Sequence, residues 1–516
     1  MQDRLSSRLS IARPGLLSGV CAASVIALLS STVPTNALVI PVIDVIPNAA
    51  SAETDQNSEP SLAVDPLNPN MMISGAFSNV RSGNDLVTPY WISTNEGTTW
   101  SSFGSLPSAD KTLAWEQSGA AALTATLNIN SFGPPVVTDH ISTFQSGASN
   151  FGAPVNTTAV QQLDQPWIRT GPGGQTYLAY NNLGNAGGRT ASMIVSGNNG
   201  STYASQVTLE TVNPAGRQDA PSVRQAVNGS TVYAAFTRWG AVTENDANGM
   251  RFGNSQVVIV KSTNSGASFS GGVTAATVTG YFANASNTPL TLGQERTSSD
   301  LAIAVDPNNA NRVVVAYGDA PGANGSGLLQ LHVAESTDGG TTWTNKFTTS
   351  TSVRSALPAL TITQNGDVAL LYASYNPSSN QLTQNLVTTT DDFATSTSSL
   401  LGTQSNATPT VNFFPYLGDF YDLTSVGNTL FGIFSASNDD NGTNALYPDA
   451  VFQRNFTGTE GTASFQLKDL VGNNVALSID PFVFSLNLAQ VPEPATLTLL
   501  GTALIGLAVL RRRWRT

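Results

Sequence analysis

The sequence predicts an all-β fold, a β-propeller of four-stranded blades with a signal peptide before it and a single transmembrane helix after it. Three observations support this prediction: a short turn motif recurs, apolar strands restart at a regular spacing, and charged residues make up only 11% of the 516 residues. Abundant Gly, Ser, Thr and Asn suit many short strands joined by turns, and an apolar content of 40% can supply a core. Wholesale disorder is therefore excluded.

An eight-residue turn motif, Ser-x-Asp/Asn-x-Gly-x-Ser/Thr-aromatic, recurs along the chain. Its Asp or Asn can hydrogen-bond nearby backbone groups, its glycine supplies a positive φ, and its aromatic ring can fold under the turn. We interpret the motif as a structural hairpin staple rather than a calcium loop, because too few carboxylates follow it. Complete copies begin at Ser93, Ser196, Ser262 and Ser336, and weaker copies begin near Ser146 and Thr389. The structural positions are Asn95, Gly97, Trp100, Asn198, Gly200, Tyr203, Asn264, Gly266, Phe269, Asp338, Gly340 and Trp343.

Apolar strand–turn–strand units restart about every 59 residues, and each complete turn motif follows a start by some 30 to 40 residues. The starts lie near Ser61, Ala120, Trp167, Ser222, Leu301, Ala359 and Tyr416. A period of this size with four strands per unit is typical of propellers, and it places the motif between the outer two strands. We expect the propeller to span residues 58–488 with seven blades, or six if the unit near Ala120 is an insertion.

The turn motif resembles the Asp-box, or BNR repeat, of the sialidase superfamily and of many non-enzymatic propellers. In the sialidase superfamily, three arginines grip a carboxylate, a tyrosine activated by a glutamate is the nucleophile, and an aspartate is the acid/base. That family also carries an Arg-Ile-Pro motif in its first blade, which this sequence lacks; the nearest phrase runs from Pro166 to Arg169 in a different order. A Tyr–Glu pair cannot be assigned either, so the resemblance implies architecture more than chemistry.

Residues just before each strand start should converge at one end of the central channel. These residues are Glu59, Asp164, Arg217, Asp219, Arg296, Asp300, Arg354, Tyr416 and Asp419. Such a mixture suits a polar ligand, for example an acidic glycan, and Arg217, Arg296 and Arg354 can form a carboxylate-binding trio. The candidate catalytic residues are Asp164, Asp219 and Tyr416. The alternative interpretation of the whole set is hydrogen bonding between blades.

Charge and composition exclude several kinds of site. The net charge is −12 and becomes −18 once the two ends are removed, because seven arginines and one aspartate leave; this argues against nucleic acid and anionic lipid as partners. The single cysteine, Cys21, lies in the leader, and two distant histidines make zinc improbable. We predict no cofactor. Residues 438–444 resemble a calcium loop in composition but lack its final glutamate, so we expect a surface turn, with calcium as the alternative.

Both ends of the chain carry targeting signals. Residues 1–37 are predicted to be a signal peptide, and residues 38–57 a flexible lead-in. At the other end, Val491, Pro492, Glu493 and Pro494 precede an apolar run, residues 495–510, and an arginine cluster. This order resembles the PEP-CTERM sorting signal of bacterial surface proteins over residues 491–516, which implies processing by an exosortase. An ordinary C-terminal anchor is the alternative.

Two functional hypotheses follow. The first is an exported propeller, transiently anchored in the inner membrane and then passed to the cell surface or extracellular matrix, that binds an extracellular polysaccharide or a surface protein without catalysis. The second is a sialidase-like glycoside hydrolase, or a polysaccharide lyase, that acts on acidic glycans. Propellers host both classes, so the fold alone cannot decide between them.

Overall fold

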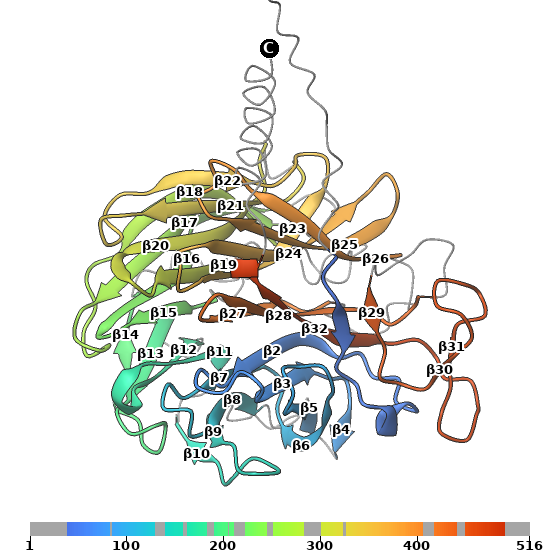
Figure 1. Ribbon diagram of the computed structural model, residues 1–516. Coiled ribbons are helices and arrows are strands. Elements are labelled where there is room, and N and C mark those ends of the chain that lie inside the picture. The colour runs from blue at the N-terminus through green and yellow to red at the C-terminus, as the bar shows by residue number, and fades with distance from the viewer. Residues whose placement is uncertain are drawn as a thin grey trace, which may run out of the picture. The chain divides into compact units, whose positions relative to one another are not determined.

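A computed structural model shows an all-β propeller of seven four-stranded blades around a central channel, as predicted (Figure 1). It describes residues 39–82, 85–128, 140–157, 163–182, 190–204, 206–210, 222–244, 251–282, 301–322, 327–405, 417–440 and 449–490. The unit near Ala120 is a blade of its own, although its first strand begins earlier, at Lys111. Seven blades are therefore confirmed.

Each blade, numbered 1 to 7 along the chain, contributes its first strand to the wall of the channel. These first strands are β2 (Ser58–Val64), β7 (Lys111–Trp115), β11 (Leu163–Thr170), β15 (Arg224–Asn228), β19 (Leu301–Asp306), β23 (Arg354–Ile362) and β27 (Asp422–Val426). The second strands are β3 (Met72–Phe77), β8 (Ala122–Asn128), β12 (Thr176–Asn182), β16 (Thr231–Glu244), β20 (Asn309–Asp319), β24 (Val368–Asn376) and β28 (Thr429–Ser437).

The outer half of each blade consists of its third and fourth strands. The third strands are β5 (Asp85–Ser93), β9 (His140–Gln145), β13 (Thr190–Ser196), β17 (Arg251–Ser262), β21 (Gln330–Ser336), β25 (Gln381–Thr389) and β32 (Ile479–Asn487). The fourth strands are β6 (Ser101–Pro107), β10 (Val155–Asn156), β14 (Val207–Thr208), β18 (Val273–Phe282), β22 (Thr344–Thr348), β26 (Thr397–Ser405) and, in blade 7, β1 (Val42–Asp44). The remaining elements are β4 (Arg81–Ser82), β29 (Ala450–Val451), β30 (Phe456–Thr457), β31 (Gln466–Leu467) and the 3-10 helices η1 (Asn48–Ala50), η2 (Pro172–Gly174) and η4 (Leu488–Gln490).

Strand β1 closes the ring, which differs from the flexible lead-in expected for residues 38–57. It pairs antiparallel with β32, with Ile43 opposite Val483, and parallel with β29. Val42 and Val45 are fully buried, because this short apolar run fills the outer edge of blade 7. The polar residues 49–57 misled the sequence interpretation, since part of their polarity serves buried hydrogen bonds instead of contact with solvent.

A buried ion-pair cluster fastens this N-terminal segment to blade 7. Arg454, from the insertion between β28 and β32, contacts Asp480 at 2.9 Å and Glu53 at 3.1 Å. Burial, and next the negative charge of Asp480, raises the pKa values of Asp44 and Glu53 well above their ordinary range. A single guanidinium thus neutralises only part of a mainly acidic cluster.

The four complete turn motifs share one hydrogen-bond geometry. Each joins the third strand of a blade to the fourth, and the motif serine accepts a hydrogen bond from the glycine N–H four residues on, at 2.9–3.0 Å. The motif Asn or Asp accepts a second bond from the backbone N–H four residues on, at 2.9–3.1 Å. The motif beginning at Ser336 also meets the start of the second strand of its blade, where Gly339 N–H donates to the carbonyl of Asn311 at 2.9 Å. The motifs therefore lie at the end of the blades opposite to where the first strands begin.

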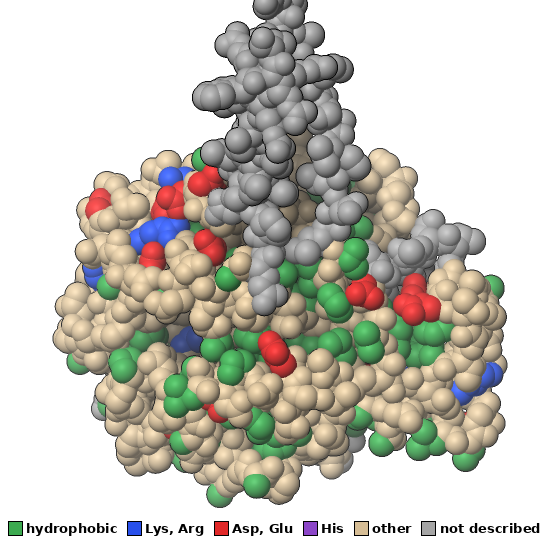
Figure 2. All heavy atoms as spheres, in the orientation of Figure 1, with side chains coloured by type: hydrophobic (Ala, Val, Ile, Leu, Met, Phe, Trp, Pro, Cys, Tyr) green, Lys and Arg blue, Asp and Glu red, His purple; other side chains and the backbone are tan. Residues whose placement is uncertain are grey.

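The surface is as poor in charge as the composition suggests. Figure 2 shows one face on which charged side chains are few and scattered among uncharged polar and apolar ones. Among the described residues, this face therefore carries no large cluster of charge that would mark a binding site.

Candidate functional site

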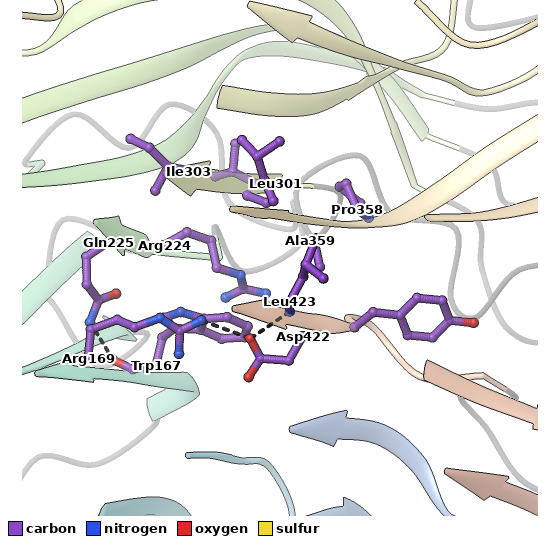
Figure 3. Close-up of a pocket in the computed structure, with 13 residues that line it drawn as sticks. Trp167, Arg169, Arg224, Gln225, Leu301, Ile303, Pro358, Ala359, Asp422 and Leu423 are labelled. Atoms are coloured by element: carbon purple, nitrogen blue, oxygen red, sulfur yellow. Dashed lines mark hydrogen bonds and ion pairs between the residues drawn. The ribbon is translucent and has the colours of Figure 1, made fainter. Parts of the chain in front are cut away.

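A small cavity of about 20 Å³ lies in the central channel, where the first strands of five blades face one another (Figure 3). It adjoins a wider cavity of about 180 Å³ farther along the same strands, and Arg169, Gln225 and Ile303 line both. Blades 3, 4 and 7 supply its polar side, and blades 5 and 6 supply an apolar side. The polar lining residues are Arg169, Arg224, Gln225 and Asp422. The other lining residues are Trp167, Leu301, Ala302, Ile303, Pro358, Ala359, Leu360, Tyr421 and Leu423.

Strained bulges shape the end of the channel at which the first strands begin, which we call the channel mouth. Glu59, Gln165 and Leu357 have φ values of 50°, 52° and 59°, and each precedes a proline within a break in strand register. The left-handed conformation costs a residue with a side chain roughly 1–3 kcal/mol. A bulge also bends the strand and changes the direction of its side chain. Blades 1, 3 and 6 therefore each contain a β-bulge that changes the direction of one side chain at the mouth.

Arg224 is the most unusual group in the cavity. It is 2% exposed, and its guanidinium carbon lies 3.8 Å from the centroid of the Trp167 ring. Its Nη2 donates to Gln165 Oε1 at 3.3 Å, but its Nε and Nη1 have no hydrogen-bond partner among the described residues. Burial, reinforced by the positive charge of Arg169, lowers the pKa of Arg224 to about 9. Arg224 is thus a buried cation with two donors that have no partner among the described residues.

Arg169, in contrast, is already paired. Its Nη2 lies 3.1 Å from Asp422 Oδ1. The other oxygen of Asp422 accepts from Ser61 Oγ at 3.0 Å and from Leu62 N–H at 3.3 Å. Asp422 therefore joins blades 1, 3 and 7 and offsets the charge of Arg169.

Lys111 is a third cation at the mouth and is fully buried. Its Nζ donates to the backbone carbonyl of Glu59 and lies 5.4 Å from the centroid of the Phe420 ring. Burial lowers the pKa of Lys111 to about 8, and the charge of Glu59 opposes this shift only in part. Lys111 is not among the residues that line the cavity, so its charge contributes to the electrostatics of the mouth.

The structure describes four of the predicted site residues. Glu59 and Asp419 are buried at the mouth, where Gly418 packs against the backbone of Glu59 and Asp419 Oδ2 accepts from Gln165 Nε2 at 2.9 Å. Asp164 is half-buried and accepts from the Gln165 N–H at 3.0 Å, and Arg354 is half-buried at the start of β23. The other predicted site residues, Arg217, Asp219, Arg296, Asp300 and Tyr416, lie outside the described residues.

Sequence reasoning missed Arg169, Arg224 and Trp167. It looked for ligand groups before the strand starts, whereas these side chains lie within first strands and line the channel. The available signal was alternation: a long polar residue at an inward position of a channel strand has no other surface to occupy.

The predicted surface turn at residues 438–444 is wrong at its first residue. Asn438 is fully buried, and its Nδ2 donates to Ser478 Oγ at 2.8 Å and to Asp480 Oδ2 at 2.9 Å. Residues 441–448 lie outside the described residues. Within the part of the chain that the structure describes, no three His, Asp or Glu side chains are grouped to hold a metal ion.

The predicted membrane span, residues 495–510, also lies outside the described residues. Among the residues that are described, no helix has the length and apolar character needed to cross a bilayer.

Several solved propeller structures are similar to this chain. An α-L-arabinanase from Penicillium chrysogenum complexed with arabinobiose is 10% identical, with a TM-score of 0.42, over 88% of this chain and 99% of that one. An ulvan lyase of polysaccharide lyase family PL25 is also 10% identical, with a TM-score of 0.42, over 77% and 96%. A Hadza microbial sialidase is 13% identical, with a TM-score of 0.37, over 63% and 66%.

Sequence comparisons locate one family at the C-terminus. No curated protein matches the chain. Residues 490–513 match the PEP-CTERM protein-sorting motif, which confirms the tail predicted from Val491 onward. This motif implies an exported protein that is held by a C-terminal membrane anchor until an exosortase processes it.

Proposed function

We propose that this protein is an exported cell-surface propeller that binds an acidic glycan at its channel mouth and does not cleave it. The observation that carries the proposal is Arg224, a buried guanidinium that lines the cavity and has two donors without a partner in the described part of the chain. A buried charge without hydrogen bonds is costly, and a carboxylate can satisfy two guanidinium N–H groups at once. An anionic ligand would therefore find a preformed partner.

The apolar side of the cavity supports a sugar as the rest of the ligand. Leu301, Ile303 and Pro358 line the wall supplied by blades 5 and 6. The apolar wall continues into the wider adjoining cavity through Ile303, Leu360 and Leu423. A pyranose ring presents C–H groups on one face, so a uronic acid type of sugar can direct its carboxylate toward Arg224 while its ring lies in this wider part of the channel. Sites of this kind combine apolar walls with a few polar groups that fix orientation.

The carboxylates near the cavity support binding rather than catalysis. Asp422 is the one carboxylate among its described lining residues. Both of its oxygens are already occupied, by Arg169 on one side and by Ser61 and Leu62 on the other. A general acid/base needs an oxygen within reach of the reacting atoms, and glycosidases use two such groups. The described residues that line the cavity provide no carboxylate oxygen that is free for either role.

We also propose that the four turn motifs are Asp-box repeats with a structural role. Their shared hydrogen bonds support this assignment, as does their distance from the mouth along each blade. The proposal places ligand binding and turn stabilisation at opposite ends of the propeller.

Binding of the purified mature domain to a panel of sialosides and acidic polysaccharides tests the function. We expect an acidic member to bind and no sugar to be released. Arg224→Met should weaken binding by about 2–4 kcal/mol, roughly 30-fold or more, because the ligand's charge would lose its buried partner. Arg238→Met is the control, since Arg238 pairs with Glu210 away from the cavity. Release of any sugar, or unchanged binding by Arg224→Met, would contradict the proposal.

A further inference from the structure

The side-chain amide of Gln165 bonds to the Arg224 guanidinium on one side and to the Asp419 carboxylate on the other. Gln165 Oε1 accepts from Arg224 Nη2 at 3.3 Å and from Ser222 Oγ at 2.7 Å, while Gln165 Nε2 donates to Asp419 Oδ2 at 2.9 Å. All these groups except Ser222, which precedes β15, belong to the mouth already described, and all four side chains are buried.

The position of this amide has an electrostatic consequence. A buried arginine and a buried aspartate attract strongly, and a direct pair would use the guanidinium donors and cancel the charge. An amide is neutral and offers an acceptor at one end and a donor at the other. It therefore bonds to Arg224 at one end and to Asp419 at the other without neutralising Arg224.

We infer that Gln165 is a positioning residue that prevents Arg224 from pairing with Asp419 and so keeps Arg224 available to an anionic ligand. The inference rests on the proposed function, because it concerns the same site. It also accounts for the strained backbone: with φ at 52°, the bulge directs this side chain between the two charges.

The equivalent bulges show that strain alone does not supply this role. Leu357 occupies the corresponding place in blade 6 and packs in an apolar core cluster. Glu59 occupies it in blade 1, where its backbone carbonyl accepts from Lys111. Of these three described bulges, the one in blade 3 places a side-chain amide against Arg224.

Acetate titration is the test, because acetate requires the guanidinium but not the shape of a sugar. Gln165→Met removes the amide at similar size, and we expect acetate to bind about tenfold or more weakly than to wild type. Gln165→Glu places a carboxylate against Arg224 and should weaken acetate binding to a similar extent.

The double variant Gln165→Met/Asp419→Asn should restore acetate binding to near the wild-type level, because the competing carboxylate of Asp419 is gone. Thermal unfolding of each variant verifies folding, and Leu357→Met, at the equivalent bulge, should bind acetate normally.

The outcomes separate the inference from the proposed function. Acetate binding that survives in Gln165→Met, or that fails to return in the double variant, overturns the inference, since a merely structural residue would show no such rescue. Absence of acetate binding to folded wild type also overturns it. Acetate binding with the expected variant pattern but no binding of any acidic glycan supports the inference and removes the proposed function alone.

Discussion

At the residue scale, Gly418 shows how closely the mouth is packed. Its φ is +95°, and a Cβ atom there would lie 2.4 Å from both the backbone nitrogen and Cγ of Glu59. Gly418→Ala should lower the free energy of unfolding by about 2–5 kcal/mol, from left-handed strain plus overpacking. Gly427→Ala is the matched control: its φ is +60° with nothing within 4 Å, so about 1–2 kcal/mol is expected. Equal losses in chemical denaturation would show that the contact with Glu59 is not tight.

Lys111 makes a second prediction at this scale, through the pH dependence of stability. Its pKa in the folded protein is about 8, against an ordinary value of 10.5. Between these values the unfolded chain holds a proton that the folded protein has released, so stability should rise with pH. The rise amounts to about 3 kcal/mol over the full window.

The control for this prediction is Lys111→Met. Buried tyrosines also titrate in alkaline conditions, so the quantity to measure is the difference in unfolding free energy between wild type and Lys111→Met from pH 7 to 10. That difference should shift in favour of wild type as pH rises. A constant difference would mean that Lys111 titrates normally.

At the element scale, the repeated turns look alike in sequence but differ in burial. Trp100 is 5% exposed, and Gln453 of the blade 7 insertion accepts its backbone N–H at 2.8 Å. Trp343 is only partly buried, although its Nε1 makes the same bond to the motif glycine carbonyl, at 3.0 Å. The blade 7 insertion therefore contacts the turn that contains Trp100, whereas Trp343 stays more exposed.

Alanine substitution should therefore lower the free energy of unfolding by a different amount at each of the two tryptophans. Trp100→Ala is expected to cost about 3–5 kcal/mol in unfolding free energy, and Trp343→Ala about 2–3 kcal/mol because less surface is lost. Neither should change ligand affinity, since both lie at the far end of the blades. Loss of binding by a stable variant would show that the motif takes part in the site.

The features that could be predicted from the sequence at this scale are those formed by residues close to one another in the chain. The turns, the strand order within blades and the blade count depend on residues close in sequence, and the motif beginning at Ser336 contains most of its own hydrogen-bond partners. Strand β1 could not be predicted, because its partner β32 lies at the other end of the chain. Arg224 was missed for a similar reason: its importance depends on Gln165 and Trp167 of the neighbouring blade, and no local pattern marks that convergence.

At the scale of the whole molecule, the sorting motif makes a prediction about the mature protein. Residues 490–513 match it, and a helix over the 16 residues 495–510, as expected from the sequence, would be about 24 Å long, shorter than the roughly 30 Å hydrocarbon core of a bilayer. We expect transient retention, cleavage near Pro494 and transfer to the surface. The intact mass of the surface-associated protein, measured by mass spectrometry, should correspond to a chain that lacks residues 495–516. A mass that retains them would leave a permanent anchor.

Closure of the ring by β1 has a consequence for the time course of folding. Ile43 pairs with Val483, so β1 finds its partner only after nearly all the rest of the propeller has been synthesised. Pairing across such a separation raises contact order and slows folding. Both strands must also have reached the same compartment before they can meet. We therefore expect blade 7 to be the last blade completed, since its outer strand cannot be paired before β32 has been synthesised.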